Sequence, residues 1–327
     1  MHAITVPATT LWTSPDAPRD VDAPITKASP DPAEWARSLD VPARRDLHDR
    51  VHTQLLLGEP VEVIGESGDW LEVIAPWQPS KLDPRGYPGW LPRDHVAAWE
   101  PPEVAADAVV AVTTTPVDGD GVVSYATYGT ILPVAEETSD RVRVLLPDGG
   151  SGWLARSACV VRRRRGRGSA QESGETRPEP TGRQVLDVAR RFVGLDYLWG
   201  GMSAFGLDCS GLVHLSFRTV GVTVPRDADD QAAAADSVPV DEAQAGDLYF
   251  FRRSDRPVHH VGFATGTAGH LLHSPRTGRQ IVEEPLDAER QATLMSKAGR
   301  FVSPSELSAP HHTGQGGDEQ RADDEAE

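Results

Sequence analysis

The sequence is poor in cysteine and has no long apolar segment. Its 327 residues include two cysteines, Cys159 and Cys209, too few for the disulfide framework of a small secreted domain. Two free thiols are typical of a reducing compartment. No apolar run approaches the ~18 residues of a membrane-spanning helix. The first residues also lack the basic and apolar regions of a secretory signal. The sequence therefore predicts a cytoplasmic protein without a membrane segment.

Positive charge is also scarce. The chain carries 32 Lys and Arg against 49 Asp and Glu, a net charge of −17. A phosphate backbone would be repelled over most of such a surface, so we expect no nucleic-acid partner. The hydrophobic content of 39% is that of a globular protein, and the length allows two or three domains.

Short apolar runs separated by turn residues occur twice with one pattern. Gly129 lies 71 residues after Gly58, and Trp153 lies 63 residues after Trp90. The first copy is thus about eight residues longer, and the extra residues fall in the loop 78–85. Alternating apolar runs bounded by Gly and Asp are typical of β-hairpins.

Two copies of one small barrel explain this repeat best. We assign residues 1–100 to the first barrel and 101–161 to the second, and expect Trp70, Trp90 and Trp153 in their cores. The alternative is two unrelated β-meanders.

Two segments have little apolar surface to bury. Residues 162–182 are predicted to be a flexible linker, and the acidic residues 303–327 a disordered tail. Between them, residues 183–302 show helical periodicity first and strand patterns afterwards, which is the order of an α+β domain. The expected helices cover 185–192, 209–220 and 227–235, and the expected strands cover 247–251, 261–264, 271–273 and 280–282.

Cys209 is the first candidate for chemistry. It follows Asp208 at the predicted start of a helix, where unpaired N–H groups and the helix dipole favour a thiolate. A lone cysteine is more often a small buried apolar residue, so the assignment needs further support.

That support comes from two histidines and a tyrosine. His260 and His273 lie on adjacent predicted strands, which can place the two imidazoles side by side. One would then act as the base for the thiol and the other would orient it. Tyr197 precedes a Gly-rich loop that leads into Cys209, which brings a phenol close to the thiol.

Several short motifs in this region resemble those of the NlpC-type papain-like cysteine peptidases. The match covers about residues 185–285, in the same order as in that family. The motifs are Tyr197-x-Trp-Gly-Gly, Asp208-Cys-Ser-Gly-Leu-Val, Pro225-Arg-Asp, Ala245-Gly-Asp-Leu, His260-Val-Gly and Leu272-His.

The resemblance implies a papain-like α+β domain behind two bacterial SH3-like barrels. It implies Cys209 as nucleophile, His260 as general base and His273 as the residue that orients it. Tyr197 is implied near the oxyanion. Substrate contacts are implied for Asp208 and Ser210. The resemblance implies no metal or cofactor.

The family cleaves stem peptides of peptidoglycan, commonly between γ-D-glutamate and diaminopimelate or lysine. The first barrel resembles that of the cytoplasmic branch that recycles wall peptides. In that branch a tyrosine of the first barrel closes the subsite for the peptide's free N-terminus, and Tyr87 is the matching position in this sequence. The resemblance therefore implies an enzyme that releases the dipeptide L-Ala-γ-D-Glu.

Two departures concern this free-amine specificity. Ala228 stands where the family often has Ser. An acidic residue from the first barrel is also expected to meet the substrate's ammonium; His52 occupies the first position to examine, and Glu59 lies nearby. The alternatives are an endopeptidase acting on polymeric wall and a catalytically silent wall-binding protein. The third substrate residue and the oligomeric state stay open.

Overall fold

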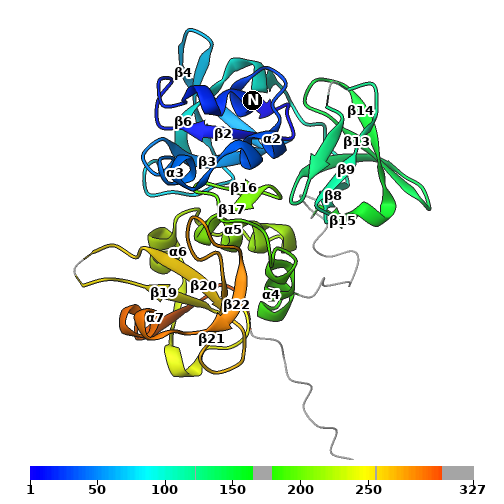
Figure 1. Cartoon of the computed structure of the whole chain (residues 1–327). Coiled ribbons are helices and arrows are strands. Elements are labelled where there is room, and N and C mark those ends of the chain that lie inside the picture. Colours follow the sequence, from blue (N-terminus) through cyan, green and yellow to red (C-terminus); the bar gives the residue numbers. More distant parts are fainter. Residues whose placement is uncertain (122, 165–178, 255, 304–327) are drawn as a thin grey trace, which may run out of the picture.

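The structure, a computed structural model, describes the chain except for residues 122, 165–178, 255 and 304–327. Figure 1 shows two β-rich bodies followed by a body of helices and strands. Most of the predicted linker and nearly all of the predicted acidic tail lie outside the described residues. No helix in the described part of the chain is long and apolar enough to cross a membrane.

The first body is a strongly curved sheet of seven strands with short helices inserted after its second strand. The sheet order is β3-β2-β6-β5-β4-β1-β7. The sequence reading missed the first two strands and the inserted helices. The elements are β1 (His2–Ile4), β2 (Ala8–Trp12), α1 (Ala23–Thr26), α2 (Pro32–Ser38), α3 (Val41–Arg45), β3 (Val51–Leu56), β4 (Pro60–Ser67), β5 (Trp70–Ala75), β6 (Tyr87–Pro92) and β7 (Val96–Ala98).

The second body is smaller and consists of a six-stranded and a two-stranded sheet. Its last strand continues to Arg163, inside the range assigned to the linker. The larger sheet has the order β10-β14-β13-β12-β8-β15. The strands are β8 (Ala106–Val110), β9 (Thr114–Pro116), β10 (Asp118–Gly119), β11 (Tyr125–Thr127), β12 (Ile131–Glu137), β13 (Arg141–Leu145), β14 (Ser151–Ala155) and β15 (Cys159–Arg163).

The repeat predicted from the sequence is visible in the backbone. Gly58 and Gly129 precede equivalent strands, and their φ angles are 82° and 83°. A side chain is strained in this left-handed conformation, which explains why both copies have glycine there.

The prediction that the repeated tryptophans fill the barrel cores is wrong. Trp70, Trp90 and Trp153 are half-buried, whereas valine and leucine fill the two interiors. Trp70 and Trp90 pack against a separate cluster that contains the fully buried Trp12. Arg141 lies over the Trp153 ring at 5.6 Å from its centroid.

The third body packs helices against an antiparallel sheet of order β18-β23-β19-β20-β21-β22. The α+β order predicted from the sequence is confirmed. The last expected strand lies slightly later, and the reading missed β18, α7 and β23. The elements are α4 (Gly182–Arg190), β16 (Met202–Ser203), β17 (Gly206–Leu207), α5 (Cys209–Val220), α6 (Ala228–Ala234), β18 (Asp236–Pro239), β19 (Leu248–Phe251), β20 (His260–Ala264), β21 (His270–His273), β22 (Val282–Pro285), α7 (Ala288–Thr293) and β23 (Lys297–Arg300).

The central helix α5 has well-defined ends. The Asp208 side chain accepts a hydrogen bond from the Gly211 N–H at 2.6 Å, which caps the first turn. At the other end, Gly221 adopts φ 96° and stops the helix. The buried face of α5 packs against β20. This packing brings the start of the helix to the sheet.

Both barrels contribute to the core of the third body. Ala8 and Leu56 of the first barrel and Tyr128 of the second belong to the same apolar cluster as Leu215 of α5. The ring of Tyr128 meets that of Phe192 edge-on at 4.9 Å. The three bodies therefore share buried apolar surface, which holds them in one arrangement.

A buried ion pair fastens the first barrel to α5. Arg218 Nη1 donates to Glu59 Oε1 at 2.5 Å, and both side chains are almost wholly buried. Glu59 also accepts from Gln78 of the inserted loop at 3.2 Å. Arg218 lies over the Trp77 ring at 5.0 Å.

Removing one member of this pair should be costly. Glu59→Ala leaves a buried guanidinium without its counter-charge, and we expect it to lower the free energy of unfolding by about 3–5 kcal/mol. Urea unfolding followed by tryptophan fluorescence measures this. The double variant Glu59→Leu with Arg218→Leu removes both charges and should recover most of the loss. A loss below about 1 kcal/mol in Glu59→Ala would show that the pair does not fasten the barrel.

Candidate active site

Cys209 is the first residue of α5 and is partly exposed in a pocket of about 450 Å³. Burial raises the pKa of its thiol to about 12, and the nearby Asp208 carboxylate adds to this effect. The backbone N–H groups of Val261 and Ser210 favour the thiolate, but less strongly. Burial thus outweighs the helix terminus in its effect on this pKa, contrary to the expectation from sequence.

His260 lines the same pocket from the first position of β20. Burial lowers the pKa of its imidazole well below the usual value, and His273 and Arg290 add to the effect. The imidazole is therefore neutral and able to accept a proton. Within the described residues no hydrogen bond joins Cys209 to His260. Catalytic hydrogen bonds of a free active site often tighten only when substrate binds.

The two histidines are in direct contact. His260 Nε2 lies 2.7 Å from His273 Nδ1, and the rings meet edge-on. The neighbouring antiparallel strands β20 and β21 bring them together. Burial lowers the pKa of His273 to about 3, with Arg290 and Arg279 contributing, so this ring is neutral as well.

A carboxylate continues this chain of hydrogen bonds. His273 Nε2 lies 3.1 Å from Glu284 Oε1 on β22. A carboxylate can only accept, so His273 donates from Nε2 and accepts at Nδ1. His260 then donates from Nε2 and keeps its lone pair on Nδ1. That is the tautomer a general base for the thiol requires.

The sequence reading missed Glu284. The strand predicted at 280–282 begins at Val282 and runs to Pro285, and Leu272 pairs with Glu283 in the register. The register pairs His273 with Val282 and Leu271 with Glu284, so a correct strand would have placed Glu284 on the same face as His273, as its diagonal neighbour. The second oxygen of Glu284 accepts from Arg279 Nη2 at 3.2 Å, which holds the carboxylate in place.

Asp208 and Ser210 flank the cysteine and bind one buried arginine. Arg226 is 1% exposed and donates to Asp208 Oδ2, to Ser210 Oγ and to Thr53 Oγ1 of the first barrel, each at 2.8 Å. Asp208 also accepts from the Gly200 N–H. Both side chains are thus bound to other groups of the protein, and their substrate contacts stay predictions.

Two tyrosines contribute hydroxyl groups. Tyr197 lines the pocket beside Cys209, and burial raises the pKa of its phenol, so it keeps its proton and can donate. Tyr87 comes from the first barrel and donates to Asp227 Oδ2 at 2.9 Å. Gly86 before it has φ 149°, and a Cβ there would lie 2.3 Å from the Ala75 carbonyl oxygen. Only glycine lets the chain turn into Tyr87 at this point.

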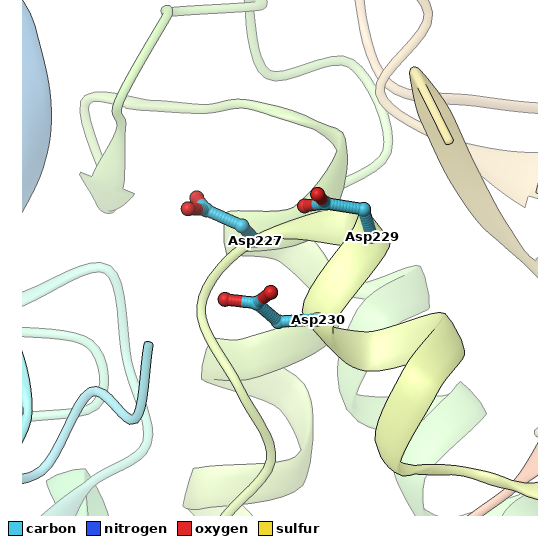
Figure 2. Close-up of side chains that lie close together, drawn as sticks. All are labelled: Asp227, Asp229 and Asp230. Atoms are coloured by element: carbon cyan, nitrogen blue, oxygen red, sulfur yellow. The ribbon is translucent and has the colours of Figure 1, made fainter. Parts of the chain in front are cut away.

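Figure 2 shows three carboxylates at the start of α6, from Asp227, Asp229 and Asp230. They lie close enough to hold one metal ion, but other groups bind them in this structure. Lys81 of the inserted loop pairs with Asp229 and Asp230, and Tyr87 binds Asp227. The extra residues of the first repeat thus attach the barrel to the wall of the site.

The acidic residue expected from the first barrel is not found at either position considered. Glu59 is fully buried against Arg218, so it is not available to a substrate. His52 is a histidine whose ring lies 5.5 Å from that of Tyr87. The carboxylate beside Tyr87 is Asp227, from the third body. Asp227 precedes α6 without a side-chain capping bond.

A thiol at a helix start that shares a pocket with a neutral imidazole is the arrangement of a cysteine hydrolase. The helix packs its start against an antiparallel sheet that carries the imidazole. This combination of fold and site defines the papain-like class of cysteine peptidases.

Comparison with known proteins agrees with this class. The family model described as NlpC/P60 family matches residues 194–300, and that described as YKFC SH3b2 domain matches residues 123–161. A gamma-D-glutamyl-L-lysine dipeptidyl-peptidase of Bacillus subtilis is 33% identical over 86% of this chain and 92% of its own. A protein of the same name from Bacillus cereus is 32% identical over 91% and 90%.

A solved structure gives the same result. The crystal structure of an NlpC/P60 family protein from Bacillus cereus has a TM-score of 0.83 and 30% identity, and covers 92% of this chain and all of its own. The chain therefore belongs to the NlpC/P60 family, with an SH3b-type β-rich region ahead of its papain-like domain. It is a peptidase, and the resemblance noted in the sequence is confirmed.

Glu284 offers a test of the hydrogen-bond chain. Glu284→Leu removes the acceptor for His273, and we expect kcat for peptide hydrolysis to fall about 10²-fold with KM nearly unchanged, the size of a general-base effect. Glu284→Gln keeps an acceptor oxygen and should recover at least a tenth of the activity. Equal activity of the two variants, or a rise in KM alone, would contradict the positioning role.

The lowered pKa of His260 predicts the acid limb of the pH profile. The base is neutral above its pKa and is lost as pH falls through that value, so half-maximal kcat/KM should lie below pH 6.5, the ordinary value for histidine. Steady-state rates from pH 4 to 8, with the melting temperature measured at each pH, check this. An acid limb at or above pH 6.5 with the protein still folded would contradict a buried neutral imidazole.

Proposed function

We propose that the protein is a dipeptidyl-peptidase of wall-peptide recycling. It hydrolyses the bond between γ-D-glutamate and a diamino acid, diaminopimelate or lysine, in peptides released from peptidoglycan. One observation carries this proposal: Tyr87 of the first barrel donates to Asp227, next to the Arg226 that binds the side chains on both sides of Cys209. We infer that the barrel closes this end of the site. The similarity to dipeptidyl-peptidases over most of both chains supports it.

The mechanism is acyl transfer. As the Cys209 sulfur attacks the γ-glutamyl carbonyl, His260 takes the thiol proton and His273 holds the imidazole in place. The C–N bond breaks when His260 gives that proton to the leaving amine, and a thioester remains. Water, deprotonated by His260, then attacks the thioester, and the dipeptide carboxylate and the thiol are released. The Cys209 N–H and the Tyr197 hydroxyl stabilise the oxyanion.

The blocked end of the site favours a short substrate with a free amine. Asp227 places a carboxylate beside the Tyr87 hydroxyl, where it can meet the ammonium of L-Ala. An N-terminus linked to the glycan strand has no ammonium and continues into the polymer, so it would clash with the barrel. Asp208 and Ser210 border this end of the substrate.

The domain assignment and the location belong to the same proposal. The sequence assigns barrels to 1–100 and 101–161, a linker to 162–182, a catalytic domain to 183–302 and a tail to 303–327. Because β15 runs to Arg163 and α4 begins at Gly182, we infer that the second barrel ends at 163 and the catalytic domain begins at 182. Both described thiols are free, which supports a cytoplasmic location.

The catalytic assignment is tested by Cys209→Ala. We expect turnover by this variant to fall at least 10³-fold, because alanine has no sulfur to attack the carbonyl group. Its melting temperature should stay within a few degrees of that of the parent. Cys159→Ala, which alters the other thiol, is the matched control and should keep full activity. Turnover within tenfold of the parent in Cys209→Ala would refute the mechanism and favour a silent wall-binding protein.

The substrate is tested by comparing three materials. Free L-Ala-γ-D-Glu-diaminopimelate should be cleaved to L-Ala-γ-D-Glu, as seen by mass spectrometry. Its N-acetylated copy should react at least tenfold more slowly because the ammonium contact is lost. Intact sacculi should react least. A preference for sacculi would replace the proposal with the endopeptidase alternative.

A further inference from the structure

The catalytic pocket has a charge opposite to that of the chain. The protein carries a net charge of −17, yet six arginines line the pocket that contains Cys209, and the acidic residues among its lining are Asp287 and Glu289. Such a reversal concentrates anionic ligands in the pocket. The arginines are Arg44, Arg45, Arg253, Arg276, Arg279 and Arg290.

This pocket lies on the leaving-group side of the sulfur. The leaving amine takes its proton from His260, so the leaving amino acid must occupy the His260 side of Cys209. The pocket includes both of these residues but neither Tyr87 nor Asp227. The basic region thus faces the diamino acid and not the L-Ala-γ-D-Glu portion.

Most of the arginines already have an acidic partner. Arg44 pairs with Asp196 at 3.3 Å and binds three backbone carbonyls. The other three paired arginines meet Glu289, Glu284 and Asp287. These four side chains are held by the protein itself.

Arg45 and Arg276 differ from the rest. Within the described residues their guanidinium groups have no hydrogen-bond or ion-pair partner, and both side chains are exposed at the pocket. Arg45 ends α3 of the first barrel, and Arg276 follows β21 of the catalytic domain. Two free guanidinium groups from different bodies at one pocket are suited to a carboxylate.

We propose that Arg45 and Arg276 bind a second carboxylate on the leaving diamino acid, so that the pocket selects diaminopimelate over lysine. This inference rests on the proposed function. The side chain of diaminopimelate ends in a carboxylate and an ammonium group. Asp287 and Glu289 can bind the ammonium group, while the two arginines bind the carboxylate. Lysine ends in an ammonium group alone, which the surrounding arginines repel. The specificity therefore differs from the one that the relatives' names state.

The test compares three tripeptides that share L-Ala-γ-D-Glu. Their third residues are diaminopimelate, lysine and diaminopimelate amidated on its side-chain carboxylate. We expect kcat/KM for the diaminopimelate peptide to exceed that for each of the other two peptides by about tenfold or more. Each charge-assisted contact to a partly exposed carboxylate should raise kcat/KM roughly fivefold. The amidated peptide separates the side-chain carboxylate from the α-carboxylate that all three share.

Charge-removing variants test the two residues. Arg45→Gln and Arg276→Gln should each lower kcat/KM for the diaminopimelate peptide about fivefold and change that for the lysine peptide less than twofold. Arg183→Gln removes an exposed arginine on α4, away from the pocket, and should change neither. An equal effect on both peptides, or no preference in the parent, would overturn the inference while the proposed function stands.

Direct binding keeps the inference testable if hydrolysis fails. When no tripeptide is cleaved, the proposed function is refuted, and calorimetry with free diaminopimelate and free lysine then measures the pocket alone. Binding of diaminopimelate at least fivefold tighter than lysine, and loss of that difference in Arg276→Gln, would support the selectivity. Equal binding of the two amino acids would refute it.

Discussion

The structure around the thiol depends on the buried guanidinium of Arg226. It binds the side chains on both sides of Cys209 and reaches Thr53 of the first barrel through its Nε–H. A charge so deeply buried is tolerated only when its donors are satisfied and an opposite charge is adjacent. Asp208 supplies that charge and caps α5 as well. One side chain therefore ties together the start of the helix, the residues on both sides of the thiol and the first barrel.

The docked barrel brings two of its side chains to the catalytic domain. Tyr87 donates to Asp227 before α6, where we propose that the N-terminal portion of the substrate lies, and Arg45 lines the pocket that contains Cys209. The loop 78–85, present in the first repeat alone, carries Lys81 to the acidic start of α6 (Figure 2). The catalytic domain therefore supplies the reactive groups, while the groups proposed to select the substrate come from both the barrel and the catalytic domain.

The acid–base part of the site is a line of buried neutral rings that ends at a carboxylate. Burial keeps His260 and His273 uncharged, and Glu284 decides which nitrogen of each ring carries the proton. Burial also raises the pKa of the Cys209 thiol, and in the proposed mechanism the thiol loses its proton to His260 as the sulfur attacks. The arginines that keep Glu284 in place, Arg279 and Arg290, also line the pocket that contains Cys209.

The sequence by itself determined the α+β order, the repeated barrel and the short motifs around Cys209, His260 and His273. Local periodicity, capping residues and turn glycines act over a few neighbouring positions, and a linear pattern contains them. The tertiary structure alone decided that burial outweighs the helix terminus at the thiol, that Arg226 pairs with Asp208, and that Glu284 completes the hydrogen-bond chain. These results depend on desolvation and on contacts between distant segments, which arise only when the chain has packed.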